Sequence, residues 1–296
     1  MDYFAIKQNY YSGNYVDALK EIESSHGSDS DETLIFYRSK VQLALQKYTP
    51  GTNSTRLAKL FDLYYSFLQS KDISELKAEV NEESTKPYEL NILATALAIL
   101  GKLDDALKYC VKGIDSEEQL GKTELLLCAV EVALLNGKFS IASTIFENYT
   151  SLDDFAVSSE NELIINLAES YIKFATNKDT TGSNFYYYEE LAQTFPTWKT
   201  QLGLMNLHLQ QGNIVEAQGI VDLLESDYYS VNQKEAADLY KPHFLANKIT
   251  LSIMQGASNT EDLKNQLADL DPEHSLIKSD KQVNAKFDEI VARYSS

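Results

Sequence analysis

One six-residue phrase occurs four times along the chain: a glycine, then Lys or Asn, an apolar or aromatic residue, two variable positions and an alanine. Each copy interrupts one apolar helical run and opens another. Glycine ends a helix at low cost because it adopts the left-handed conformation, and alanine lets the second helix approach the first closely. The phrase therefore predicts the corner of an antiparallel helix pair. Its copies begin at Gly13, Gly101, Gly137 and Gly212.

The spacing between these glycines gives the length of the repeat. Gly101 and Gly137 are 36 residues apart. Gly212 follows after 75 residues, which is two units of about 37. A period in the mid-thirties with two helices in each unit is typical of tetratricopeptide-like repeats. The sequence therefore predicts an all-α, tetratricopeptide-like helix-turn-helix solenoid, a right-handed superhelix of about eight helix pairs.

The repeats are predicted to form a single solenoid domain over residues 1–296, with three departures from the regular pattern. Residues 50–87 hold two amphipathic helices on a poorer pattern, and a loop over residues 176–184 replaces the tight turn of its unit. A last helix over residues 281–294 is expected to cap the final unit, because a solenoid needs a cover at each end. Its apolar positions are Val283, Phe287, Ile290 and Tyr294.

The composition excludes several classes of function. A net charge of -18 over 296 residues, with no run of Lys or Arg, makes binding to nucleic acid or anionic lipid unfavourable. The start of the chain has no basic leader followed by an apolar core, and no window approaches the ~18 apolar residues of a membrane span. We therefore expect a soluble, cytoplasmic protein that does not insert into membranes.

The two cysteines, Cys110 and Cys128, lie inside apolar helical stretches. Buried thiols in such stretches behave as small hydrophobic side chains, so we expect neither a disulfide nor a metal site there. This interpretation fits a reducing compartment, in which disulfides are rare.

An enzyme should leave a recognisable set of nucleophile, base or metal ligands, and the sequence contains none. The four histidines are widely spaced and lack a Cys, His or carboxylate partner at ligand spacing. The Gly-Lys-Thr triplet at residues 121–123 lacks the earlier glycine of a phosphate-binding loop, because that place is Ser116, and we expect a turn into a helix. We therefore expect no catalytic, cofactor-binding or metal-binding residues. The histidines are His26, His208, His243 and His274.

Two features concern how the chain would hold a partner. Some repeats of this kind clamp a carboxylate with Lys, Asn and Arg, but the corresponding places here are Asn91 and Thr95. In the next unit they are Glu124 and Leu127, so a basic clamp is missing. In the aromatic run at residues 184–191, three consecutive tyrosines cannot all enter a core, because successive helical side chains point ~100° apart. At least one of them is therefore a candidate recognition residue.

Several long blocks of the sequence resemble the coatomer epsilon subunit family in its budding-yeast form. They include MDYFAIKQNYYSGNY at the start, PYELNILATALAILGKLDDAL, and NFYYYEELAQTFPTWKTQLGLMNLHLQQGNI. The resemblance covers nearly the whole chain. It implies a structural subunit of the COPI vesicle coat that grips the C-terminal region of the alpha coatomer subunit. It also implies a role in Golgi-to-ER retrograde and intra-Golgi transport, with peripheral attachment to Golgi membranes and COPI-coated vesicles through the coat.

The repeat geometry places one set of first-helix residues on the groove face, where they would contact the partner. The alternative function is a soluble tetratricopeptide adaptor that binds short peptide segments of another partner, and the missing basic clamp argues against it. An enzyme is a distant third possibility. The candidate partner-binding residues are Tyr88, Asn91, Thr95, Leu127, Glu131, Leu134, Leu202, Asn206 and Leu209.

Overall fold

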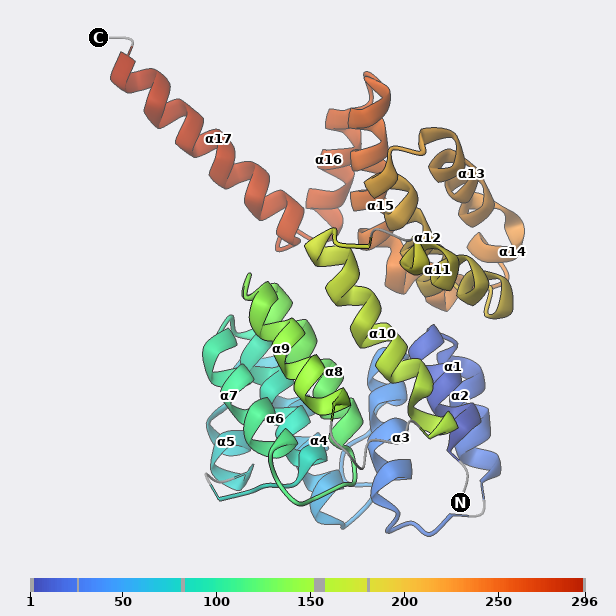
Figure 1. The fold of residues 1–296 in the computed structure, drawn as a ribbon, viewed down its shortest axis with the longest axis vertical. Helices are drawn as coiled ribbons and strands as arrows, with labels where there is room; N and C mark the ends of the chain where they lie inside the picture. Colours follow the sequence, from blue (N-terminus) through green and yellow to red (C-terminus); the bar gives the residue numbers. More distant parts are fainter. Residues whose placement is uncertain (1–2, 26, 81–82, 152–157, 180–181, 295–296) are drawn as a thin grey trace. The chain divides into compact units, whose positions relative to one another are not determined.

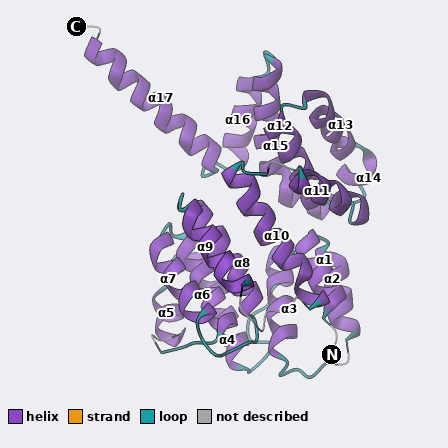
Figure 2. Ribbon diagram, viewed as in Figure 1, coloured by secondary structure: helices purple, strands orange, loops and turns teal. Residues whose placement is uncertain are grey.

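A computed structural model describes the chain except residues 1–2, 26, 81–82, 152–157, 180–181 and 295–296. Over the described residues the secondary structure is helical and contains no strand (Figure 2). Within each of its two compact units, successive helices pack against one another (Figure 1). The prediction of an all-α, tetratricopeptide-like repeat architecture is therefore confirmed.

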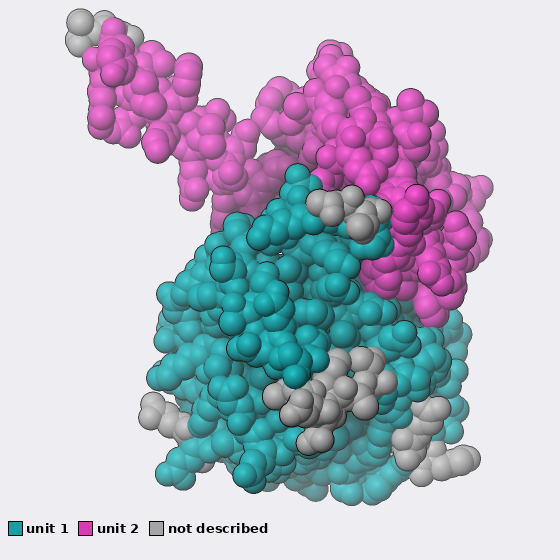
Figure 3. Space-filling view, in the orientation of Figure 1, with its two compact units in different colours: residues 1–184 teal, residues 185–296 magenta. Residues whose placement is uncertain are grey.

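The chain divides into two compact units, residues 1–184 and 185–296, which are coloured separately in Figure 3. Each unit is described by itself. The helices of unit 1 are α1 (Phe4–Ser12), α2 (Tyr15–Ser24), α3 (Glu32–Ala44), α4 (Arg56–Ser70), α5 (Ser74–Val80), α6 (Pro87–Ile99), α7 (Leu103–Ile114), α8 (Lys122–Leu135), α9 (Phe139–Thr150) and α10 (Ser159–Thr176). Helix α11 (Ser183–Thr194) begins at the boundary, and unit 2 continues with α12 (Trp198–Gln211), α13 (Ile214–Glu225), α14 (Asp227–Ser230), α15 (Lys234–Gln255), α16 (Thr260–Leu270) and α17 (Ser275–Tyr294).

All four predicted corners are present, at the junctions of α1 with α2, α6 with α7, α8 with α9, and α12 with α13. Each glycine of the repeated phrase has a φ between 68° and 87°, in the left-handed region where a side chain would be strained. Each alanine of the phrase is completely buried between the two helices of its pair. Both roles assigned to the phrase are confirmed. The alanines are Ala18, Ala106, Ala142 and Ala217.

Helix α7 comes unusually close to its neighbours α6 and α8 at Gly113. A Cβ built on Gly113 would lie 2.5 Å from Cδ2 of Leu125 in α8 and 2.8 Å from Cδ1 of Leu90 in α6. Both leucines are fully buried, so neither can move aside without disturbing the core. The missing side chain therefore sets the distance between α7 and α8.

The irregular regions of the sequence also form helices. The two amphipathic helices predicted within residues 50–87 are α4 and α5, separated by Lys71 in the left-handed conformation with a φ of 60°. The loop predicted over residues 176–184 joins α10 to α11, and residues 180–181 lie outside the described part. Asp179 accepts hydrogen bonds from the backbone N–H groups of Ser183 (3.2 Å) and Asn184 (2.6 Å), so this loop caps the start of α11.

The first and last helices of unit 1 pack on each other, which the repeat pattern did not predict. Helix α10 contacts both α1 and α8, as Figure 1 also shows. The ammonium of Lys7 in α1 donates to Oδ1 of Asn161 in α10 at 2.7 Å, across 154 positions of sequence. The backbone N–H of Tyr3 donates to Oε1 of Glu160 at 3.2 Å. These contacts close unit 1 on itself.

Unit 2 has a core around Trp198, whose Nε1 donates to the carbonyl oxygen of Tyr229 at 3.2 Å. A second apolar cluster joins α15, α16 and the first turn of α17, where Ile277 is buried. Beyond this turn α17 is exposed, whereas the sequence led us to expect a capping helix packed on the last unit. The exposed fractions are 63% for Val283, 63% for Phe287, 45% for Ile290 and 86% for Tyr294.

Candidate partner-binding site

The predicted groove residues of unit 1 fall into a buried set and an accessible set. Tyr88, Asn91 and Leu127 are buried. The ring of Tyr88 stacks on Phe36 with 4.2 Å between ring centroids, and its hydroxyl lies 3.3 Å from Oγ1 of Thr33. Asn91 and Leu127 are inside because α6 and α8 pack directly against each other, whereas Tyr88 is covered by α3.

The accessible set consists of Thr95 and Leu134, which are half-buried, and Glu131, which is exposed. Thr95 lies one helical turn after Asn91, and its hydroxyl donates to the carbonyl oxygen of that residue at 2.7 Å. Glu131 and Leu134 lie near the end of α8, on either side of the buried Val132 and Ala133. Repeat spacing alone identifies the inward face of a helix, but it does not show which residues of that face are buried and which are accessible.

Thr95 and Glu131 belong to a larger group of side chains that meet on one side of unit 1, which we call the inner cluster. Its members interact electrostatically although they come from five helices, α1, α3, α4, α6 and α8. Four of them are half-buried, one is buried and one is exposed, so the group lies at the edge of the core. The inner cluster consists of Tyr10, Lys40, Tyr64, Thr95, Cys128 and Glu131.

Burial shifts the pKa values of Lys40 and Tyr10. Burial lowers the pKa of the Lys40 ammonium, and the nearby acidic groups of Cys128 and Glu131 partly oppose that shift. Burial raises the pKa of Tyr10 well above its ordinary value, with smaller contributions from Tyr15, Glu131 and Tyr64. The inner cluster thus offers phenol groups, an ammonium and a carboxylate, which suit hydrogen bonding to a polypeptide.

A network of buried hydrogen bonds connects the inner cluster to the core of unit 1. Lys40 donates to Oδ1 of Asn91 at 2.9 Å, and Nδ2 of Asn91 donates to the carbonyl oxygen of Glu124 at 3.1 Å. The carboxylate of Glu124 is buried, where it accepts from Lys7 at 2.9 Å and from the Tyr37 hydroxyl at 2.7 Å. Glu124 and Asn91, the residues at the places of a carboxylate clamp, therefore hold the helices of this unit together.

In unit 2, Leu202 and Leu209 are buried and only Asn206 of the predicted set is half-exposed.

The three consecutive tyrosines of α11 differ in exposure, as expected. Tyr186 is 65% exposed, whereas Tyr188 is buried and lies against Gly203 of α12, where a Cβ would come within 2.4 Å of the ring. Tyr186 is therefore the accessible residue of the aromatic run.

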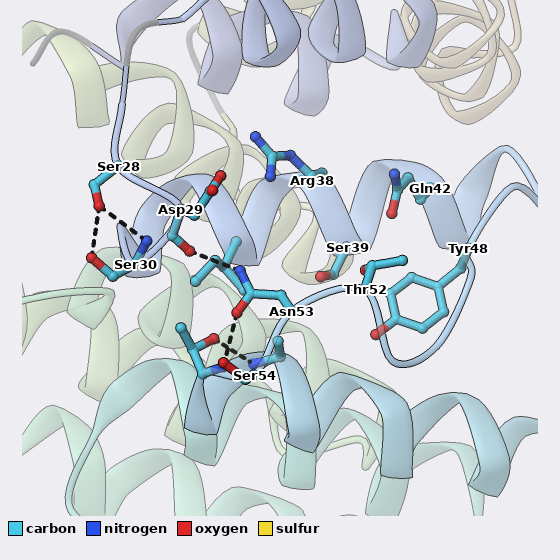
Figure 4. A pocket seen from close by; sticks show the side chains of 13 residues that line it. Ser28, Asp29, Ser30, Arg38, Ser39, Gln42, Tyr48, Thr52, Asn53 and Ser54 are labelled. Carbon is cyan, nitrogen blue, oxygen red and sulfur yellow. Dashed lines mark hydrogen bonds between the residues drawn. The ribbon is translucent and has the colours of Figure 1, made fainter.

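The sequence did not predict a polar pocket of about 580 Å³ that lies between α3 and the start of α4 (Figure 4). Asn53 crosses it: its Nδ2 donates to the carbonyl oxygen of Asp29 at 2.7 Å, and its Oδ1 accepts from the Thr55 backbone at 2.8 Å. The described residues that line the pocket include serines, threonines and Arg38, but neither His nor Cys.

The described histidines have structural surroundings. His208 is buried against the ring of Phe185, with 5.2 Å between centroids. The rings of His243 and His274 lie 5.8 Å apart, and Nδ1 of His274 accepts from the Leu276 N–H at 3.3 Å at the start of α17. His26 lies outside the described residues. In the described part of the chain, no group of three or more His, Cys, Asp or Glu side chains is placed to hold a metal ion.

The triplet at residues 121–123 is a turn into a helix, as predicted: Gly121 has a φ of 84° and α8 begins at Lys122. None of the helices in the described part of the chain has the length and apolar character that a membrane span requires. The geometry thus offers an accessible polar and aromatic surface on a helical repeat scaffold.

Comparisons with known proteins agree with this description. The family model for the coatomer epsilon subunit matches residues 2–295. The coatomer subunit epsilon of Saccharomyces cerevisiae (strain ATCC 204508 / S288c) is 61% identical over 296 residues, which cover 100% of this chain and 99% of that protein. The resemblance inferred from the sequence blocks is confirmed over the full length. The chain therefore belongs to the coatomer epsilon subunit family.

Proposed function

We propose that this chain acts in the COPI vesicle coat by holding the C-terminal region of the alpha coatomer subunit. As a coatomer epsilon subunit it is a structural coat component and not an enzyme, and the coat serves retrograde transport from the Golgi to the ER. The observation that carries the proposal is the inner cluster, where polar and aromatic side chains from five helices converge. Such a surface suits prolonged contact with another polypeptide.

Within the proposed interface, the accessible residues would contact the partner directly. Thr95, Glu131 and Leu134 would touch the partner in unit 1, and Asn206 would do so in unit 2. The buried residues of the predicted set would act indirectly, by fixing the helices that carry the surface. These are Tyr88, Asn91, Leu127, Leu202 and Leu209.

The proposal includes a long-lived interface, since coat subunits remain assembled together. Such interfaces bury more than ~2,000 Å² and are rich in apolar contacts. Attachment to Golgi membranes and COPI-coated vesicles would be peripheral, through the partner subunit.

The proposal also keeps the prediction of one domain over residues 1–296. If the chain is one domain, calorimetry of the free chain should give a single unfolding transition. Two separate transitions would contradict the single domain.

The test is co-purification of the full chain with the C-terminal third of the alpha coatomer subunit, followed by gel filtration and thermal unfolding of each protein alone and together. We expect a one-to-one complex with a raised melting temperature, because a ligand that binds only the folded state stabilises it. Separate elution at micromolar concentrations with unchanged melting temperatures would reject the proposal. An unrelated repeat protein of similar charge serves as the control for non-specific association.

A further inference from the structure

The two cysteines, which the sequence led us to expect as small buried hydrophobic side chains without a disulfide, form a close pair in unit 1. Cys110 lies in α7 and Cys128 in α8, and their Sγ atoms are 3.9 Å apart. A disulfide has a sulfur–sulfur distance of about 2.05 Å, so the two sulfurs would need to approach by only about 1.9 Å.

Helices α7 and α8 also pack closely one turn away from the pair. Gly113 lies one turn after Cys110, and Leu125 lies one turn before Cys128, so the two contacts share one antiparallel register. At Gly113 the helices are so close that a Cβ would come within 2.5 Å of the Leu125 side chain.

The two thiols differ in access and in charge. Cys110 is completely buried, whereas Cys128 is 8% exposed and belongs to the inner cluster. The hydrogen bond from the Cys110 thiol, together with nearby Lys40, lowers the pKa of Cys128, although burial opposes this. The same hydrogen bond and burial raise the pKa of Cys110. Cys128 is thus the more accessible and the more acidic of the two thiols.

We propose that Cys128 and Cys110 are an oxidation site for peroxides, in which Cys128 reacts first and Cys110 resolves the product into an α7–α8 disulfide. The Cys128 thiolate attacks hydrogen peroxide: a sulfur–oxygen bond forms, the oxygen–oxygen bond breaks, and hydroxide leaves as water after gaining a proton. Sulfur is oxidised and peroxide is reduced. Cys110 then attacks the sulfenic sulfur, the sulfur–sulfur bond forms, and hydroxide leaves with the Cys110 proton as a second water.

The experiment treats the reduced full chain with increasing hydrogen peroxide and measures intact mass and thiol content after denaturation. We expect loss of both thiols together, a mass decrease of about 2 Da for the two hydrogens, and full reversal by dithiothreitol. Peptide mapping of the treated wild-type chain should give one linked peptide pair containing both cysteines. This readout does not depend on any variant folding correctly.

Two variants separate the roles of the sulfurs. Cys110→Ser should accumulate a sulfenic acid at Cys128 that dimedone labels, because the resolving thiol is absent. Cys128→Ser should leave Cys110 reduced at peroxide levels that oxidise the wild-type chain. Independent conversion of both cysteines to sulfinic acids without a linked peptide would overturn the proposal. So would a disulfide that joins two chains, seen as a dimer on a non-reducing gel.

Discussion

Lys7 in α1 and Glu124 in α8 form a buried ion pair, with 2.9 Å between Nζ and Oε1 and side-chain exposures of only 8% and 2%. The pair joins the first helix of unit 1 to a helix 117 positions later in sequence. Both groups have further partners, because Lys7 also donates to Asn161 and Glu124 also accepts from Tyr37. The pair is therefore part of the contact that closes unit 1.

Replacement of Lys7 by Met should destabilise the chain by about 3–5 kcal/mol, because the Glu124 carboxylate is left buried without its counter-charge. Urea unfolding measures the change in the free energy of unfolding. The matched control is Lys20→Met, which breaks an exposed pair with Asp17 at 2.6 Å and should cost less than ~1 kcal/mol. Equal effects of the two substitutions would contradict a special role for the buried pair.

Substitution of Gly113 by Ala should lower the free energy of unfolding by about 1–3 kcal/mol, since its Cβ would overlap two buried leucine side chains. The control is Gly219→Ala in α13, where no atom lies within 4 Å of the added Cβ. That change should stabilise the chain by up to ~1 kcal/mol, because alanine favours the helix. Thermal unfolding of both variants tests the close approach of α7 and α8 directly, and stabilisation by both would refute it.

The sequence predicted the corners of the helix pairs because their signal is local. Gly137 ends one helix and Ala142 packs in the next, and both roles depend on residues within one turn. The burial of Tyr88 could not be predicted in this way, because it depends on contacts with Phe36 in α3, far away in sequence. The distance between Cys110 and Cys128 likewise depends on the register of α7 against α8.

The residues of the candidate site were predictable only in part, for the same reason. Repeat spacing selected Thr95 and Glu131, which are accessible in the structure, but it gave no signal for Lys40 or Tyr64, which lie in the less regular early repeats. From the sequence alone, Lys40 would be predicted to be an exposed lysine on the surface. Its place among Asn91, Cys128 and Glu131 follows only from the packing of α3 against later helices.

Alkaline pH should destabilise the chain through its inward-facing tyrosines. Burial and the nearby Cys128 raise the pKa of Tyr64 to about 12, from an ordinary value of 10.0. The folded state thus favours the neutral phenol, so this contribution to stability is complete below pH 10 and is lost between pH 10 and about 12. Tyr64→Phe cannot ionise and should lose less stability over this interval, as measured by urea unfolding at each pH.

The control for this prediction is Tyr186→Phe, which removes a hydroxyl from a side chain that is 65% exposed in the folded state. Because this substitution removes no buried group, it should leave the wild-type loss of stability unchanged. Identical pH profiles for Tyr64→Phe and the wild-type chain would contradict the assigned burial of Tyr64.

Removal of residues 281–296 should change the free energy of unfolding by less than ~1 kcal/mol, because the apolar side chains of α17 beyond Ile277 are exposed. The comparison is Ile277→Ala, which empties a buried position in the α15–α16 cluster and should cost about 2–5 kcal/mol. Calorimetry of both variants gives the answer. If the truncation costs as much as Ile277→Ala, then α17 packs as the capping helix that the sequence suggested.

Charge reversal at Glu131 tests the inner cluster as the partner-binding surface. Glu131 is exposed on α8 and its charge acts on both Lys40 and Tyr10, so a lysine there would place two ammonium groups near each other. Glu131→Lys should weaken binding of the C-terminal alpha coatomer fragment ~10-fold or more, as measured by isothermal titration calorimetry. The matched control is Glu117→Lys, which reverses an exposed charge between α7 and α8 and should leave the affinity within ~2-fold of wild type. If the wild-type chain binds and both variants bind equally well, the partner contacts a different surface, and only the site would need revision.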